Sequence, residues 1–445
     1  MNRNVSKGID RSLIWLYIIL ITIGLLCIFA NEYKEGENIL RSISKQSTDY
    51  AKQLLWVGIC SILAIFILLT DSKFFTAMSN LMYGVGILLL LITIIVGTEI
   101  KGSKSWLVLG SFRIQPSEIC KVFTTLALAK YISRVETNFQ RTRSQLIATI
   151  IILLPVFITI AQNETGLALV YFAFFLVMYR EGLPVWVLIV GFSLAALVIM
   201  TLLLKPNTLV IILSSITVLI IFIFWKRASR RKSLFYLIVM TWLLCVGITR
   251  FAVPYIFNHI LKPYQVDRIM NLVGKEYEPE SKSSQITLQN QKNNKHSKNQ
   301  SEYNVKQSKI AIGSGGLFGK GYLKGTQTRY DFVPEQRTDF IFCTVGEGFG
   351  FLGSLALLAI YLTLLLRIIV IAERQRSTFS RVYAYGVASI FFFHIIVNIG
   401  MTIGLAPVIG IPLPFLSYGG SSLIGFTLLL FILIRLDADR HMVLR

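Results

Sequence analysis

The chain has 445 residues, of which 54% are apolar and 15% charged, and its mean hydropathy is +0.65. Soluble domains carry about 25% charged residues, so this composition excludes a soluble enzyme, a disordered chain and a disulfide scaffold. The net charge is +21, and basic residues in short loops are expected to fix orientation in a membrane and to meet anionic lipid. Since no basic stripe carries a recognition motif, no nucleic-acid partner is expected.

Twelve apolar segments are long enough, or nearly long enough, to cross a hydrocarbon core of about 30 Å as helices. The sixth is short and is expected to form a helical hairpin with the fifth, turning at Gln162-Asn163-Glu164. We therefore predict an all-α polytopic membrane protein. In chain order the segments are 13–30, 53–70, 76–97, 116–133, 145–161, 166–179, 183–204, 208–225, 233–257, 340–366, 382–404 and 421–434.

Basic residues indicate how these segments are oriented. With both termini in the cytoplasm, almost every inner connection is basic, as the positive-inside rule requires. The longer segments 31–52, 98–115, 258–339 and 405–420 then face outside. The inner connections hold Arg134, Arg141, Arg143, Arg180, Lys226, Arg227, Arg230, Arg231, Lys232, Arg374, Arg376, Arg381, Arg435 and Arg440.

Residues 1–445 are expected to form one integral membrane domain with a large outer loop over 258–339. Within that loop, residues 274–304 are rich in Lys, Asn, Gln, Ser and Glu, so a solvated, mobile insertion is expected. The glycines from 313 to 325 match neither the Walker nor the dinucleotide pattern. They predict a tight turn, whose backbone amides could also hold a pyrophosphate.

The cysteines and histidines give no metal or disulfide pattern. Five cysteines lie in or beside apolar segments without paired spacing, and the four histidines are scattered. We expect the cysteines to act as small packing residues, and we predict no metal site.

Three long stretches carry a family resemblance. They are 102–121 (GSKSWLVLGSFRIQPSEICK), 307–353 and 398–422 (NIGMTIGLAPVIGIPLPFLSYGGSS). Through these stretches, and through nearly the whole chain, the sequence resembles the SEDS family (shape, elongation, division and sporulation). The run Gly410-Ile411-Pro412-Leu413-Pro414 resembles the RodA branch of that family.

The resemblance implies a fold and an activity. The fold is a SEDS-like bundle with a ten-helix core, to which this chain adds a transmembrane hairpin within 183–257, giving about 12 helices. The activity is an inverting peptidoglycan glycosyltransferase that polymerises lipid II (undecaprenyl-pyrophosphate disaccharide-pentapeptide) for cell elongation and rod shape. The alternatives are a lipid II flippase, an FtsW-like division polymerase and a structural scaffold. A transporter often shows repeated halves with broken helices, and the sequence shows no such repeat.

The resemblance also implies surroundings for the protein. They are the bacterial cytoplasmic (inner) membrane, with an extracytoplasmic active site, a class B penicillin-binding protein transpeptidase and the elongation-complex membrane proteins. No cofactor is expected, and a divalent cation is left open as the alternative.

Glycan transfer to a sugar 4-hydroxyl needs a base on that hydroxyl and donors on the departing pyrophosphate. Asp339, at the head of the tenth segment, matches the family's catalytic aspartate and is expected to be this base. The alternative is an ordinary helix N-cap. Two motifs depart from the family, because Gln-Pro-Asp becomes Gln162-Asn163-Glu164 and Gly-Glu-Glu becomes Gly346-Glu347-Gly348.

Other residues are expected to bind substrate. Glu118 and Lys121 are three residues apart in a predicted helix and share a face. An intramembrane ion pair usually faces a cavity, and a purely structural pair is the alternative. Trp106 is either an interfacial anchor or, as the resemblance implies, a neighbour of Asp339. Arg268 meets either phospholipid or substrate.

The residues that flank Asp339 complete the expected site, since Glu335 or Arg337 could tune its pKa. The full expected substrate-binding set is Trp106, Glu118, Lys121, Arg268, Gln307, Ser308, Gly315, Gly316, Lys320, Glu335, Ser417 and Tyr418.

Overall fold

The computed structural model describes residues 8–33, 46, 48–100, 103–110, 112–204, 206–223, 225, 232–256, 303–406 and 408–440. Arg268, the cluster 226–231 and residues 274–302 of the predicted insertion lie outside the described residues. The chain divides into two compact units, Met1–Leu183 with Asn304–Arg445, and Pro184–Tyr303. Each unit is described by itself.

The first unit is a helical bundle. Its central helices are α19 (Thr378–Thr402) and α20 (Gly420–Ala438). In their most apolar stretches of 18 residues, 72% and 83% of the residues are buried. The share is only 22% in the corresponding stretches of α4 and α5, as expected of helices that present side chains to lipid. The other helices are α2 (Arg11–Glu32), α4 (Asp49–Leu69), α5 (Ser72–Val96), α6 (Pro116–Ile132), α7 (Thr142–Ala161), α8 (Thr165–Val170), α9 (Phe174–Arg180), α17 (Thr326–Arg329), α18 (Ile341–Glu373), an unlabelled helix over 303–314, and the 3₁₀ turn η1 (Tyr171–Ala173).

A small antiparallel sheet follows α5. Its strands are β1 (Thr98–Ile100), β2 (Ser103–Leu109) and β3 (Phe112–Ile114), in the order β1-β2-β3. Thr98 pairs with Trp106, and Leu107 pairs with Ile114. The all-α prediction did not include these strands.

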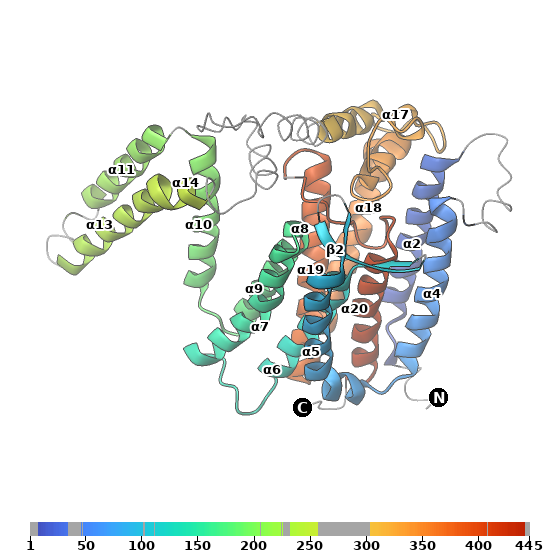
Figure 1. Ribbon diagram of the computed structural model, residues 1–445, viewed down its shortest axis with the longest axis horizontal. Coiled ribbons are helices and arrows are strands. Elements are labelled where there is room, and N and C mark those ends of the chain that lie inside the picture. Colours follow the sequence, from blue (N-terminus) through green and yellow to red (C-terminus); the bar gives the residue numbers. More distant parts are fainter. Residues whose placement is uncertain are drawn as a thin grey trace. The chain divides into compact units, whose positions relative to one another are not determined.

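Ion pairs hold together the end of the bundle at which the termini lie (Figure 1). Asp10 caps α2 by accepting from the amides of Ser12 and Leu13, and it pairs with Arg367 at 2.6 Å and Arg374 at 3.0 Å. Arg374 also pairs with the buried Asp437. The segment before α20 and the turn before α18 therefore lie at the opposite end, where Figure 1 also shows α17.

The second unit contains α10 (Val185–Leu203), α11 (Pro206–Ile223) and α13 (Lys232–Gly247), which continues through the π-helical η2 (Ile248–Ala252) into α14 (Val253–Tyr255). The indole of Trp242 donates to Ser214 Oγ at 3.2 Å, which joins α13 to α11. The additional hairpin within 183–257 stays a prediction.

All twelve predicted apolar segments coincide with helical structure. Among the described residues, eight helices are long and apolar enough to cross a membrane. Three shorter apolar helices, Thr165–Arg180, Val185–Leu194 and Asn207–Ile223, together with α6, account for the rest. The predicted turn between the fifth and sixth segments is confirmed, because α7 ends at Ala161 and α8 begins at Thr165.

Candidate active site

Asp339 lies in the turn that precedes α18, and its side chain is half-buried. The N-cap of α18 is Phe340, and no side chain caps this helix start. Asp339 is therefore not the N-cap of α18, and the capping alternative does not explain its position.

The backbone on the N-terminal side of α18 is held at three successive carbonyl groups. Tyr418 N donates to Arg337 O at 2.8 Å, and Ser417 Oγ donates to Thr338 O at 2.5 Å. Asn398 Nδ2, from α19, donates to Asp339 O at 2.9 Å. These bonds fix the peptide that carries Asp339 through its backbone carbonyls, and such preorganisation is what a positioned base needs.

The partner of this turn is the non-helical segment 408–419 that leads into α20. Asn398 Nδ2 donates to Ile411 O at 2.8 Å, His394 Nδ1 lies 3.0 Å from Pro412 O, and Tyr361 OH donates to Pro414 O at 2.6 Å. Prolines lack an amide hydrogen and cannot continue a helix, and here buried side chains contact three carbonyl oxygens of the non-helical segment. The segment is consequently a stiff wall beside the aspartate.

Gly410 brings this wall against the carboxylate. Its φ is +77°, and a Cβ added there would lie 3.3 Å from Asp339 Oδ2. The left-handed backbone and the close approach both favour glycine at this position.

Arg337 and Glu335 flank the aspartate but have other polar partners. The Arg337 guanidinium pairs with Asp49 at 2.9 Å, with Asp331 at 3.3 Å and with Glu32 at 3.5 Å. Burial opposes its charge, but these carboxylates outweigh burial and raise the pKa of Arg337. Arg337 therefore anchors the turn to α2 and α4. Which flanking residue tunes Asp339 stays a prediction.

Ser417 and Tyr418 contact the turn through different atoms. The Ser417 hydroxyl is almost fully buried and also accepts from Leu413 N at 2.8 Å. Burial, together with the charges of Asp49 and Glu32, raises the pKa of Tyr418 to about 12. Its phenol therefore stays neutral at physiological pH and can donate a hydrogen bond.

The predicted ion pair between Glu118 and Lys121 is present in α6, and both side chains are almost fully buried. The Lys121 ammonium also lies 3.2 Å from His394 Nε2 and 4.2 Å from the centre of the Phe426 ring. These three neighbours contact the ammonium, and a contact of Lys121 with a substrate phosphate stays a prediction.

Trp106 is half-buried in β2, opposite Thr98. The sheet is tied to the α7–α8 turn, because Ser103 Oγ and Ser105 Oγ donate to Glu164 Oε1 at 2.7 and 2.8 Å. Glu164 thus replaces the family's aspartate with a carboxylate that holds the strand of Trp106 in place. The contact of Trp106 with Asp339 stays a prediction.

Gln307 and Ser308 lie on the helix 303–314, Gln307 half-buried and Ser308 buried. Ser308 Oγ donates to Thr402 O at 2.9 Å and fastens this helix to the end of α19. A substrate contact of either residue stays a prediction.

The glycine-rich stretch fits into a break in α18. Gly350 has φ +65° and ψ −158°, which interrupts the helix. The freed amide of Phe351 donates to Gly316 O at 2.8 Å, and Gly321 N donates to Gly348 O at 2.9 Å. A Cβ on Gly315 would lie 2.0 Å from the carbonyl oxygen of Gly346. The glycines therefore serve close backbone packing, and the amides of residues 315, 316 and 319–321 donate to backbone carbonyls.

Glu347 fastens the segment that follows the glycines. Its buried carboxylate accepts from the amides of Thr326, Gln327 and Thr328 at 2.8–2.9 Å and pairs with Lys320 at 2.7 Å. Lys320 is thus neutralised by Glu347, and its contact with substrate stays a prediction.

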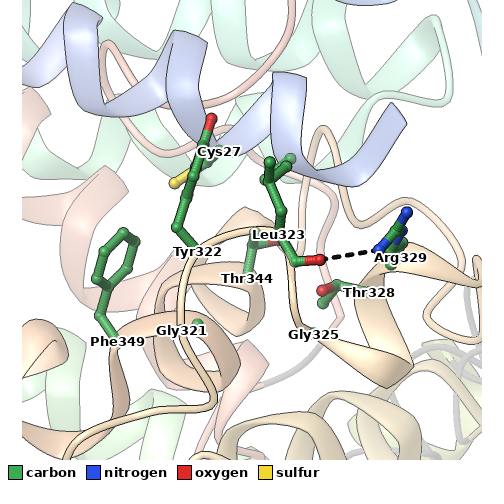
Figure 2. A pocket seen from close by; sticks show the side chains of 11 residues that line it. Cys27, Gly321, Tyr322, Leu323, Gly325, Thr328, Arg329, Thr344 and Phe349 are labelled. Atoms are coloured by element: carbon green, nitrogen blue, oxygen red, sulfur yellow. Dashed lines mark hydrogen bonds between the residues drawn. The ribbon is translucent and has the colours of Figure 1, made fainter. Parts of the chain in front are cut away.

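A small pocket lies beside this segment, between α2 and the start of α18 (Figure 2). Its lining includes Cys27, Tyr322, Leu323, Arg329 and Phe349. Arg329 donates to Leu323 O at 3.2 Å across the pocket edge. Asp339 does not line this pocket, so the pocket is separate from the candidate site.

We expect Glu347→Gln to loosen residues 320–328 without abolishing the fold. The amide cannot pair with Lys320, and its NH₂ group faces backbone donors, at a cost of about 1–3 kcal/mol. Limited proteolysis and hydrogen exchange of 320–328 measure the effect. Glu373→Gln, at an exposed pair with Arg180, is the control and should change neither. Unchanged protection in Glu347→Gln would show that the carboxylate does not hold this segment.

Sequence reasoning missed several residues of the site, namely His394, Asn398, Gly410 and the anchoring role of Glu347. His394 and Asn398 carry a recognisable signal, because polar side chains inside an apolar span are rare and usually face the bundle interior. Gly410 carries no such signal, because its closeness to Asp339 depends on a tertiary contact. Within the described residues, no group of three or more His, Cys, Asp or Glu side chains is arranged to hold a metal ion.

Comparisons with known proteins place the chain among bacterial cell-wall proteins. The family model for the cell cycle proteins FtsW, RodA and SpoVE matches residues 11–211 and 194–442. The peptidoglycan glycosyltransferase RodA of Treponema pallidum is 31% identical over an alignment of 447 positions, which covers 95% of each chain. The peptidoglycan glycosyltransferase MrdB of Escherichia coli is 32% identical over 344 residues, 77% of this chain and 73% of that protein.

Two solved structures are similar in fold. One belongs to work on the structural coordination of polymerization and crosslinking by a peptidoglycan synthase complex, with a TM-score of 0.66, 22% identity, and coverage of 98% of this chain and 99% of that chain. The other is the rod shape determining protein RodA of Thermus thermophilus, with a TM-score of 0.59, 22% identity and 98% coverage of both chains. At this identity the likeness shows the fold alone.

Proposed function

Since the chain belongs to the FtsW, RodA and SpoVE family of cell cycle proteins, we propose that it polymerises lipid II at a site centred on Asp339. Its relatives over 95% and 77% of its length are named peptidoglycan glycosyltransferases, and the chain is a peptidoglycan glycosyltransferase of the RodA type. The observation that carries the assignment of the site is the fixed backbone of Asp339, held at three successive carbonyls by Tyr418, Ser417 and Asn398.

In the proposed reaction, Asp339 accepts the proton of the acceptor 4-hydroxyl as that oxygen attacks the donor sugar. A bond forms between this oxygen and the anomeric carbon, while the bond from that carbon to the undecaprenyl pyrophosphate breaks. In-line attack on an α-linked donor gives a β-linkage, so one carboxylate suffices. Two polar side chains of the turn and its wall are proposed to contact the substrate. They are the carboxylate of Glu335 and the neutral phenol of Tyr418.

Glu118 and Lys121 are proposed to support the site from inside the bundle, and the half-buried indole of Trp106 is proposed to contact sugar or lipid at its edge. The other proposed substrate contacts follow the family resemblance. They are Arg268, Gln307, Ser308, Gly315, Gly316, Lys320 and Ser417.

The charge distribution supports an extracytoplasmic site. Arg134, Arg180, Arg374 and Arg440 lie at the end of the bundle where the termini lie, opposite the Asp339 turn, which fits cytoplasmic termini under the positive-inside rule. Lipid II polymerisation would then occur at the outer face of the cytoplasmic membrane.

Single-cysteine labelling tests this orientation. Four of the five native cysteines are buried and Cys245 is half-buried. The substitution Cys245→Ser therefore leaves only buried native thiols, so background labelling should be low. Glu136→Cys and Lys324→Cys place exposed thiols at opposite ends of the bundle. An impermeant maleimide added to intact spheroplasts should label the thiol at position 324 and spare the one at position 136. The reverse pattern would overturn the outer location of the site.

A class B penicillin-binding protein transpeptidase is the proposed partner, in keeping with the synthase complex whose structure shares this fold. Phe392 and Ile396 are exposed on the surface of α19, and they are the proposed contacts for a partner's transmembrane helix. Co-expression with the cognate transpeptidase should yield a complex and raise glycan synthesis, and Ile396→Trp should weaken both. Full activity of the protein alone, with no transpeptidase co-purifying, would contradict this partner.

The flippase alternative predicts a different readout. Proteoliposomes containing fluorescent lipid II distinguish the two functions, because a polymerase converts the lipid to glycan and a flippase changes only its accessibility to a membrane-impermeant quencher. We expect glycan formation. Translocation of lipid II without polymer would overturn the proposed function.

A further inference from the structure

His394 is a fully buried polar residue inside the bundle. It lies on α19, one helical turn before Asn398, and its ring meets the Phe426 ring edge-on at 4.8 Å. Both ring nitrogens have polar neighbours, Lys121 Nζ at 3.2 Å from Nε2 and Pro412 O at 3.0 Å from Nδ1.

The two neighbours fix how the ring is protonated. A carbonyl oxygen can only accept, so Nδ1 must carry the proton and donate it to Pro412 O. The ammonium of Lys121 can only donate, so Nε2 must be unprotonated and accept from it. The imidazole is therefore neutral, in one tautomer, and bridges the ammonium of Lys121 and the carbonyl oxygen of Pro412.

These contacts connect the buried ion pair to the wall beside Asp339. Glu118 pairs with Lys121, and His394 continues this chain of contacts to Pro412. Pro412 lies two residues after Gly410, whose Cα faces Asp339 Oδ2 closely enough that a Cβ would stand 3.3 Å from it. The imidazole of His394 thus links the wall beside the Asp339 carboxylate to the Glu118–Lys121 ion pair.

We infer that His394 is a positioning residue for glycan transfer, one that sets residues 410–412 against Asp339 by joining Pro412 to the Glu118–Lys121 pair. This inference rests on the proposed function of the Asp339 site. Its role is to hold a wall, not to exchange a proton with substrate, because both ring nitrogens are engaged and the side chain is fully buried.

Two substitutions at this position separate positioning from chemistry. His394→Gln can place an amide oxygen toward Lys121 and an amide NH₂ toward Pro412, whereas His394→Leu offers neither. Since small misplacements of reacting groups cost up to about 10²-fold, we expect His394→Leu to lower kcat by about 10- to 100-fold with the KM for lipid II nearly unchanged. His394→Gln should restore most of the lost kcat. The pH at which activity is half-maximal should be the same in all three proteins.

Hydrogen exchange provides a readout that needs no turnover. The amides of Leu413 and Tyr418 bond within the wall and to the catalytic turn, so His394→Leu should speed their exchange while His394→Gln leaves it slow. Tyr383→Phe is the matched control, because it removes another buried hydrogen bond of α19, to Leu429 O at 3.3 Å. It should change neither kcat nor exchange in 408–419.

The outcomes are distinct. The inference is wrong if His394→Leu keeps wild-type kcat or leaves exchange of 408–419 unchanged, or if His394→Gln is as impaired as His394→Leu. A shifted pH profile in His394→Gln would point to proton transfer by the imidazole and would also overturn it. If the wild-type protein itself forms no glycan, the proposed function fails, while the exchange measurement still tests the contact to Pro412.

Discussion

Asp339→Asn is expected to lower the rate of lipid II polymerisation by about 10²-fold or more, which is the usual contribution of a general base. Asparagine has nearly the same shape as aspartate, and the three hydrogen bonds that fix the turn use backbone carbonyls. The substitution should therefore remove the base while preserving the fold and the placement of residue 339. Steady-state polymerisation by purified protein, with thermal unfolding measured in parallel, gives both quantities.

Glu99→Gln is the matched control for this experiment. Glu99 is an exposed carboxylate in β1, so its neutralisation should leave polymerisation unchanged. Near wild-type polymerisation by Asp339→Asn would place the chemistry elsewhere in the molecule. A loss of activity that follows a loss of folded protein would instead make Asp339 a structural residue.

Lys121→Met is expected to destabilise the bundle strongly. It leaves the Glu118 carboxylate buried without its cation, and breaking a buried ion pair from one side typically costs about 3–5 kcal/mol. The same change removes the ammonium that His394 accepts from. A large fall in the free energy of unfolding, measured in detergent micelles, is the expected result.

The double variant Glu118→Gln/Lys121→Met removes the charge that the single variant strands. Its free energy of unfolding should be well above that of Lys121→Met, because replacing both members of a buried ion pair often changes stability little. Lys52→Met, which removes an exposed i,i+3 partner of Asp49 at 3.7 Å, is the control and should have little effect. Equal losses in the single and double variants would mean that the pair does not couple the two side chains.

The apolar segments were predictable for two reasons. A chain inside lipid must satisfy its backbone hydrogen bonds within a helix, and a helix that crosses the hydrocarbon core needs a long run of apolar residues. The turn at Gln162-Asn163-Glu164 was predictable for the same reason, since polar residues interrupt the run there. The strands between Thr98 and Ile114 were missed because they are only 3–7 residues long and lack a regular alternation of polar and apolar residues.

The contacts within the site were less predictable. Asp339 was identified through a family resemblance, but its partners come from segments about 60–80 residues further along the chain, and no local pattern encodes that pairing. The glycines from 313 to 325 correctly predicted unusual backbone. Their packing against α18 where Gly350 interrupts that helix is a tertiary contact, which the local sequence does not show. Lys121 shows the same limit, because its spacing from Glu118 predicted the pair but not the imidazole beyond it.

Glycan formation by the purified protein tests the central claim most directly. The full chain, purified in detergent with and without its transpeptidase, is incubated with labelled lipid II, and the products are separated on a gel before and after muramidase digestion. Wild-type protein should form a ladder of muramidase-sensitive glycan chains that Asp339→Asn fails to form. Lipid II that remains monomeric with the wild-type complex, or an equal ladder from Asp339→Asn, would contradict a polymerase whose base is Asp339.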